Sequence, residues 1–139
     1  MTRIESYLTF NGNCREAMTF YQDCLGGELL LQTVGESPLS DNMPAQLKQY
    51  ILHATLLRDT LILMASDMVG EQGLRRGNAV SLCLQCSSEE EILSCYARLS
   101  RQGKASHPPE RTFWGALFGG LTDRYGNHWL LNYDQQQNS

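Results

Sequence analysis

The chain has 139 residues, of which 42% are apolar and 19% charged, and its formal net charge is −4. This length allows one globular domain without disulfide support, and the scattered 11 Lys and Arg residues exclude a basic, nucleic-acid-binding surface. No apolar run approaches the ~20 residues of a membrane span, and the first residues lack the apolar core of a signal peptide, so we expect a soluble, cytoplasmic protein.

The first half of the chain begins with a predicted strand and a predicted helix. Alternating apolar residues predict the strand over residues 4–10. Asn13 is a candidate N-cap, with Glu16 three residues later, and Gly26-Gly27 ends the helix. Between these ends, apolar residues follow helical spacing: Ala17, Phe20, Tyr21, Cys24 and Leu25.

The rest of this half predicts three more strands. Residues 28–34 read as the second strand, and residues 50–57 and 61–65 read as a hairpin around a polar turn. Residues 35–49 are rich in Ser, Pro, Asp and Asn, so we expect a long loop, either a lid over a binding site or a passive connection. The predicted order is therefore β-α-β-β-β.

The second half begins with a predicted strand over residues 79–84. A helix follows, capped by Ser87 or Ser88, because each has a glutamate three residues later. The helix ends before Gly103. Its predicted core positions again have helical spacing: Ile92, Cys95, Tyr96 and Leu99.

The final segments complete the second half. A short strand is expected near residues 104–106, followed by a bend at Pro108-Pro109 and a further strand within residues 113–122. Residues 123–127 predict a turn that leads to the last strand, 128–133. This half is again β-α-β-β-β.

The two halves therefore repeat one pattern within a single domain. We expect an α+β domain over residues 1–134, made of two βαβββ modules at about 1–69 and 77–134, with a polar tail at 135–139. Two similar units must pack against something. Where they meet is a natural place for a pocket.

The five cysteines do not predict a disulfide framework, because their number is odd and no export signal is present. Cys83 and Cys86 form a CxxC pattern, but no second CxxC or histidine pair accompanies it to complete a zinc site. We favour structural thiols over metal or redox chemistry.

Several segments, taken in order, resemble a known family. They are residues 7–17, Phe20-Tyr21, 25–28, 63–67, Trp114-Gly115, Phe118-Gly119 and 123–129. Together they resemble the vicinal oxygen chelate (VOC) superfamily, also called the glyoxalase and bleomycin-resistance fold, and within it the PhnB-like branch. The resemblance implies two βαβββ modules whose curved sheets enclose a cleft, commonly in a homodimer.

Enzymes of this superfamily hold a divalent metal that polarises vicinal oxygens of the substrate. The resemblance implies four ligands, usually His and Glu, from the first and fourth strands of each module. Alignment by eye places Ser6, Ala79, Met64 and Leu130 at these positions. None is a usual ligand, so we expect no metal site and no cofactor, the alternative being a divalent metal.

The histidines form no convincing catalytic group. His53 lies on a predicted central strand, where it either contacts a ligand or is an ordinary hydrogen-bonded residue, and we favour the second reading. His107 precedes two prolines and His128 begins the last strand, so both are expected near the surface. No catalytic residue is predicted, and whether the protein is an enzyme stays open.

An aromatic and thioether set is the better candidate for ligand contact, although each member alone could be ordinary core. The candidate ligand-binding residues are Tyr7, Tyr50, His53, Met64, Trp114, Phe118 and Trp129.

We therefore expect a PhnB-like homodimer that binds an unidentified small molecule in the inter-sheet cleft, without metal. The alternatives are a metal-dependent glyoxalase or dioxygenase-type enzyme, a thiol transferase of the same superfamily, and a scaffold whose cleft is closed by side chains. Phosphate-binding glycine motifs are absent, so nucleotide chemistry has no support.

Overall fold

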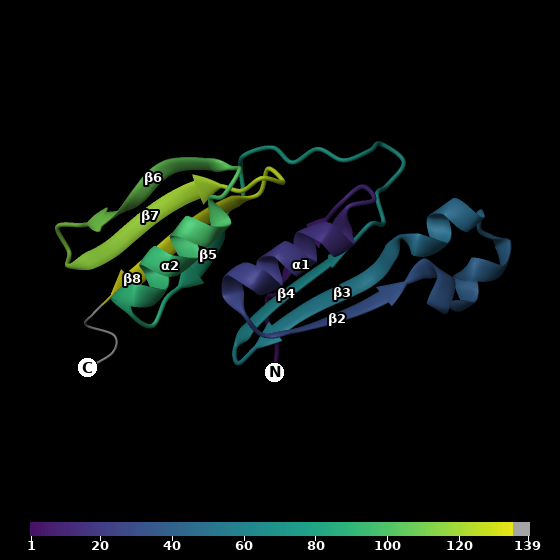
Figure 1. Cartoon of the computed structure of the whole chain (residues 1–139), viewed down its shortest axis with the longest axis horizontal. Helices are drawn as coiled ribbons and strands as arrows, with labels where there is room; N and C mark the ends of the chain where they lie inside the picture. Colours follow the sequence, from purple (N-terminus) through teal and green to yellow (C-terminus); the bar gives the residue numbers. More distant parts are fainter. Residues whose placement is uncertain (135–139) are drawn as a thin grey trace. The chain divides into compact units, whose positions relative to one another are not determined.

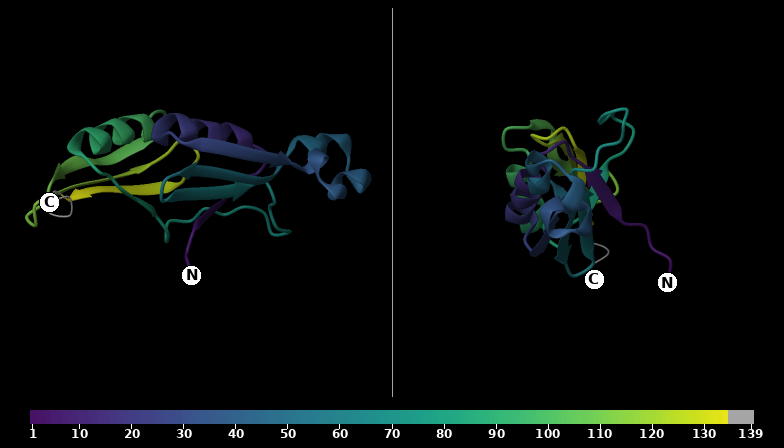
Figure 2. Two further views of the ribbon diagram at one scale, coloured as in Figure 1. Left: turned by 90° about the horizontal axis from the view of Figure 1, so that it is seen from below. Right: turned by 90° about the vertical axis from the view of Figure 1, so that its right-hand side faces the viewer.

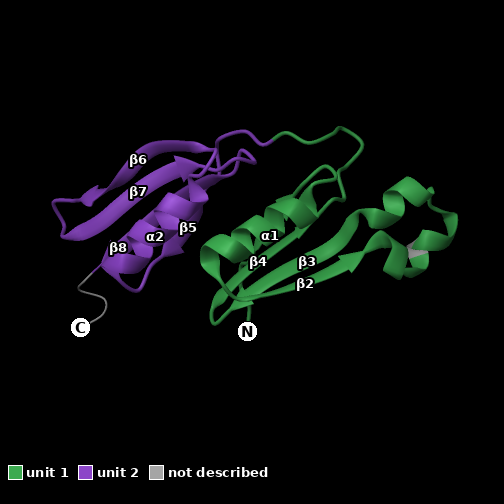
Figure 3. Cartoon of the chain, in the orientation of Figure 1, with its two compact units in different colours: residues 1–75 green, residues 76–139 purple. Residues whose placement is uncertain are grey.

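The computed structural model describes residues 1–134, except for the side chain of residue 39, and the predicted polar tail lies outside them (Figure 1). The chain divides into two compact units, Met1–Arg75 and Arg76–Ser139 (Figure 3). Among the described residues, no helix has both the length and the apolar composition needed to cross a membrane.

The first unit is a four-stranded sheet with one α-helix. Its elements are β1 (Ser6–Thr9), α1 (Cys14–Leu25), β2 (Glu28–Thr33), β3 (Ile51–Arg58) and β4 (Leu61–Ser66). The strand order is β1-β4-β3-β2, with β1 parallel to β4 and the other pairs antiparallel. The α-helix therefore connects two opposite edges of the sheet.

The second unit repeats this topology. Its elements are β5 (Leu82–Gln85), α2 (Glu89–Leu99), β6 (Lys104–Arg111), β7 (Ala116–Thr122) and β8 (His128–Asp134). The order β5-β8-β7-β6, with β5 parallel to β8, matches the first sheet strand for strand. The α+β class and the repeated βαβββ pattern are confirmed.

The long connection expected between the second and third strands contains only short 3-10 turns. They are η1 (Val34–Glu36), η2 (Pro38–Asn42) and η3 (Ala45–Gln49). The first begins with a capping box, in which Thr33 and Glu36 each bond the other's backbone amide.

Each helix covers one face of its own sheet and leaves the other face open (Figure 2). In the first unit Leu63 of β4 pairs with Leu56 of β3, and both are buried. In the adjacent cross-strand pair, Met64 and Thr55 are only partly buried. Since adjacent rows point to opposite faces, α1 packs on the leucine row. The apolar side of α1 that supplies this packing is buried as predicted: Ala17, Phe20, Tyr21, Cys24 and Leu25, joined by Cys14 and Met18.

The second sheet is arranged in the same way. Trp129 pairs with Leu121, and both are buried together with Leu131 on the side that α2 covers. The hydroxyl of Tyr96 on α2 donates to the carbonyl of Gly120 at 2.9 Å, which fixes the helix on β7. The four core positions predicted for this helix are all buried.

The two helices begin differently. On α2 the hydroxyl of Ser88 accepts the amide of Glu91 at 3.0 Å, which settles the choice between two predicted serine caps. The side chain of Asn13, the predicted cap of α1, makes no such bond. Its role belongs to Asp67, whose Oδ1 accepts the amides of Gly12 and Cys14 at 2.8 and 3.0 Å.

The first strands of both units are shorter than predicted. Pairing begins at Ser6 and at Leu82, not at residues 4 and 79. Ile4 is 99% exposed and Val80 78% exposed, so neither apolar side chain has a sheet beneath it. Alternating apolar residues extend a strand only as far as a partner strand exists beside them.

Strand β6 is longer than predicted. It continues through Pro108-Pro109, where a bend was expected, as far as Arg111. It lies at the edge of its sheet, and its pairing with β7 shifts register on both sides of His107. Proline is tolerated at an edge because its missing amide would face solvent.

The cysteines separate into one exposed and four buried thiols. Cys83 is exposed, and Cys86, three residues further along an extended segment, is buried. Burial, aided by the charge of Asp67, raises the pKa of the Cys14 thiol to about 12.

We therefore expect a thiol reagent at pH 8 to modify Cys83 quickly and the other four cysteines only as the protein unfolds. A fast phase that survives in Cys83→Ser would contradict this.

The shifted pKa of Cys14 also predicts a pH dependence of stability. In the unfolded chain this thiol loses its proton near its ordinary pKa of 9.0, whereas in the folded protein it keeps the proton to about 12. The folded state binds more protons over this interval, so its free energy of unfolding falls as pH rises. Denaturation of wild type and Cys14→Ala from pH 8 to 11 should show a steeper loss in wild type.

Candidate functional site

The open face of the first sheet carries a row of apolar side chains that no helix covers. The strand pairings place Tyr7 beside Met64, Met64 beside Thr55, and Thr55 beside Leu30. Tyr7 is 51% exposed and Leu30 50% exposed, so both side chains are accessible from solvent. The row therefore offers an accessible, largely apolar wall with two hydroxyl groups in it, those of Tyr7 and Thr55.

His53 adds a polar group to this wall. Its Nε2 lies 3.0 Å from the hydroxyl of Thr55, and its ring centroid lies 6.2 Å from that of Tyr7. Its Nδ1 makes no hydrogen bond within the described part of the chain. An imidazole beside an aromatic ring can stack on a planar ligand and exchange one hydrogen bond with it.

The open face of the second sheet has a more polar character. Phe118 pairs with Asn132, and Asn132 pairs with Gln85, so all three point to the side that α2 leaves free. The amide of Asn132 donates to the Gln85 side chain at 2.9 Å. Cys83 lies on the same face and pairs with Leu130.

The structure brings together three of the seven predicted ligand-contact residues, Tyr7, His53 and Met64. Phe118 lies on the open face of the other sheet. Tyr50 lies just before β3, beside a polar pocket described below.

The two tryptophans lie elsewhere. Trp114 is in the turn between β6 and β7, where it meets the exposed Phe113 edge to face at a centroid distance of 4.9 Å. Trp129 is only 4% exposed, and its indole donates to the carboxylate of Asp123 at 2.8 Å. Trp129 therefore lies on the side of the sheet that α2 covers and not on the open face. Every residue from 129 to 131 is apolar, so only the register decides which of them face α2.

The residues at the expected metal-ligand positions do not fit a divalent cation. Pairing makes Leu82, not Ala79, the counterpart of Ser6, because Ala79 precedes β5. Met64 and Leu130 do correspond. The set then supplies one hydroxyl and no carboxylate, imidazole or thiolate. Within residues 1–134, no three His, Cys, Asp or Glu side chains are grouped so as to hold a metal ion.

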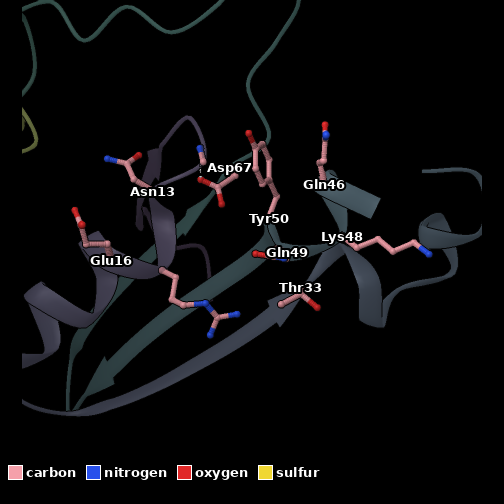
Figure 4. A pocket seen from close by; sticks show the side chains of 10 residues that line it. Asn13, Glu16, Thr33, Gln46, Lys48, Gln49, Tyr50 and Asp67 are labelled. Atoms are coloured by element: carbon pink, nitrogen blue, oxygen red, sulfur yellow. Dashed lines mark hydrogen bonds between the residues drawn. The ribbon is translucent and has the colours of Figure 1, made fainter. Parts of the chain in front are cut away.

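A polar pocket of about 600 Å³ lies where α1 begins and β3 starts (Figure 4). Its lining residues come from four separate segments: Gly12, Asn13, Arg15, Glu16, Thr33, Gln46, Lys48, Gln49, Tyr50 and Asp67. Only Tyr50 of this set is among the residues predicted from the sequence to contact a ligand. Most of the others are polar residues in predicted loops or on an exposed helix turn, which carry no pattern to connect them.

Asp67 forms the inner wall of this pocket and joins three segments. Besides its two bonds at the start of α1, its Oδ2 accepts the amide of Ile51 at 2.8 Å. The carboxylate is almost fully buried, and hydrogen bonds from three backbone amides stabilise its charge. Asp67 is therefore a structural anchor whose oxygens are already engaged.

Comparison with known proteins gives consistent matches over nearly the whole chain. A sequence model described as the Glyoxalase/Bleomycin resistance protein/Dioxygenase superfamily matches residues 3–131. Protein YjdN of Escherichia coli (strain K12) is 32% identical over 143 residues, covering 96% of this chain and 97% of YjdN.

Two solved structures agree with these sequence matches. Protein PA1353 from Pseudomonas aeruginosa is 37% identical, with a TM-score of 0.84, over 96% of this chain and 98% of that protein. A PhnB protein from Bacillus cereus is 26% identical, with a TM-score of 0.72, over 95% of this chain and 99% of that protein.

Proposed function

Because this chain belongs to the Glyoxalase/Bleomycin resistance protein/Dioxygenase superfamily, we propose that it is a PhnB-like protein that binds a small molecule without a metal. The ligand lies on the open face of the first sheet. The observation that carries this proposal is the uncovered row of Tyr7, Met64 and Leu30 with His53 beside it. Exposed apolar rows of this kind mark binding surfaces.

The side chains also indicate the class of ligand. Tyr7 and Met64 favour a flat, partly apolar molecule, and His53 favours one with a single carbonyl or hydroxyl group. No charged side chain is present in the row itself, so the ligand's main contacts there are apolar.

We further propose that the protein is a cytoplasmic homodimer, which light scattering tests by a mass of twice 15.7 kDa.

We expect flat heteroaromatic or phenolic compounds to raise the melting temperature of the wild-type protein in a thermal-shift screen. Tyr7→Ala should weaken binding of any such compound about tenfold, since a buried aromatic contact contributes on the order of 1 kcal/mol or more. Leu93→Ala, at an exposed position on α2, serves as the matched control and should bind normally. Compounds that bind Tyr7→Ala and wild type equally would place the site elsewhere.

The rival function is a metal-dependent glyoxalase or dioxygenase-type enzyme. This function differs from metal-free binding in the effect of metal on the melting temperature, because a bound metal would stabilise the folded state. Titration with Zn²⁺, Mn²⁺, Ni²⁺ and Fe²⁺ after chelator treatment should leave the melting temperature unchanged. Stoichiometric retention of metal with a rise of several degrees would overturn the metal-free proposal.

A further inference from the structure

The polar pocket near Asp67 has features that the open-face site does not explain. It contains none of Tyr7, His53 or Met64. Figure 4 shows Asn13 and Glu16 on one side of it, Gln46 and Lys48 on the other, and Tyr50 with Asp67 between them. A volume of about 600 Å³ is ordinary for a small-molecule site.

The pocket is lined by charged side chains of both signs, two cations and two carboxylates. Arg15 and Lys48 both line it, and within the described residues neither makes an ion pair or a side-chain hydrogen bond. Of the two carboxylates that line the pocket, Asp67 already accepts three backbone amides, so its oxygens are engaged, and Glu16 is the other. Arg15 and Lys48 are therefore the cationic groups that remain available to a bound anion.

The neutral side chains of the pocket are hydrogen-bonding groups. Asn13, Gln46 and Gln49 contribute three carboxamides, and Tyr50 contributes a phenol. Carboxamides both donate and accept, so they suit ligand hydroxyl groups, which do the same.

Tyr50 is placed in this wall by a close contact with Gly12. A Cβ on Gly12 would lie 3.2 Å from the phenol oxygen, and Gly12 has a φ of +97°. Glycine at this position therefore allows the tyrosine to stand against the loop that precedes α1.

We propose that this pocket is a second binding site, separate from the open face, for a small hydroxylated anion that carries a carboxylate or a phosphate group. Arg15 and Lys48 provide the cationic contacts, and the carboxamides with Tyr50 bind the hydroxyl groups. The first turn of α1 and the η3 segment both contact the ligand, so binding holds the η3 segment against the unit's core.

The probes are glycerol 3-phosphate and glycerate, which share a three-carbon hydroxylated skeleton but differ in the anionic group, with glycerol as the neutral control. We expect saturable shifts of backbone amide signals from residues 12–16 and 45–50 in two-dimensional NMR titrations. Binding of glycerol 3-phosphate alone would identify a phosphate site, and binding of glycerate alone a carboxylate site. Shifts produced by glycerol alone, or by neither anion, would overturn the proposal.

Charge variants test which side chains are responsible. Arg15→Gln and Lys48→Gln should each weaken binding of the anion about tenfold, whereas Glu16→Gln should strengthen it. Arg75→Gln and Lys104→Gln are matched exposed controls outside the pocket and should change nothing. Affinity should fall as salt rises from about 0.01 to 0.15 M, because the screening length shrinks from ~30 to ~8 Å. Equal binding by all variants would overturn the assignment.

One further variant separates the two sites. Tyr7→Ala should retain full binding of the anion, since Tyr7 does not line the pocket. If Tyr7→Ala abolishes it and Arg15→Gln does not, the ligand occupies the open face and the second site does not exist. Melting curves of each variant confirm folding, which these exposed substitutions leave intact.

Discussion

Replacing Asp67 with alanine is expected to lower the free energy of unfolding of the first unit by about 3–5 kcal/mol, because three backbone amides lose a charged acceptor. The amides of Cys14 and Ile51 are buried, so water cannot fully replace the carboxylate there. Asp67→Asn keeps one oxygen and should cost about half as much. Urea denaturation followed by far-ultraviolet circular dichroism measures both.

The matched control for this prediction is Asp41→Ala, an exposed aspartate in η2, which should change stability by less than about 0.5 kcal/mol. Tryptophan fluorescence adds a second readout, which follows unfolding of the second unit because Trp114 and Trp129 both belong to it. An unchanged midpoint for Asp67→Ala by circular dichroism would show that Asp67 is not the anchor described.

Gly27→Ala is expected to lower the free energy of unfolding by about 3 kcal/mol or more, through steric overlap and backbone strain together. An added Cβ would lie 2.5 Å from the carbonyl oxygen of Leu57 and 2.9 Å from the Cβ of Arg58. Both are parts of β3, which cannot shift without breaking its pairing with β2. The φ of +98° adds strain for any residue with a side chain.

Gly73→Ala separates the two causes. Gly73 has a similar φ of +81°, but nothing lies within 4 Å of a Cβ there, so only the strain of about 1–2 kcal/mol remains. The difference between the two variants in thermal or urea denaturation measures the steric part alone. If both lose the same stability, the close approach of Gly27 to β3 is incorrect.

The parts of the fold that follow from neighbouring residues could be predicted. The bodies of both helices depend on apolar spacing within one segment, and the Ser88 cap of α2 acts over three residues. The repeated module could be recognised because each half of the sequence contains all the segments of one βαβββ module. The turn at residues 123–127, with Gly126 at a φ of +89°, is another local signal that proved correct.

The parts that depend on distant partners could not be predicted. Asn13 has the right residue type for a cap, but the bonds come from Asp67, which reaches it only through the pairing of β1 with β4. The face on which Trp129 lies could not be predicted, because the residues after it are also apolar and only pairing sets the register. The polar pocket could not be predicted for the same reason, since it forms only when four separate segments of the chain meet.

The two helix starts also differ in when they can be completed during folding. Ser88 and the amide it accepts are three residues apart, so the start of α2 can be satisfied as soon as those residues emerge from the ribosome. Cys14 and Asp67 are 53 residues apart, and closing a loop of that length costs more entropy than a local contact. The first helix to be synthesised therefore gains its finished N-terminus only after β4 has been made and paired.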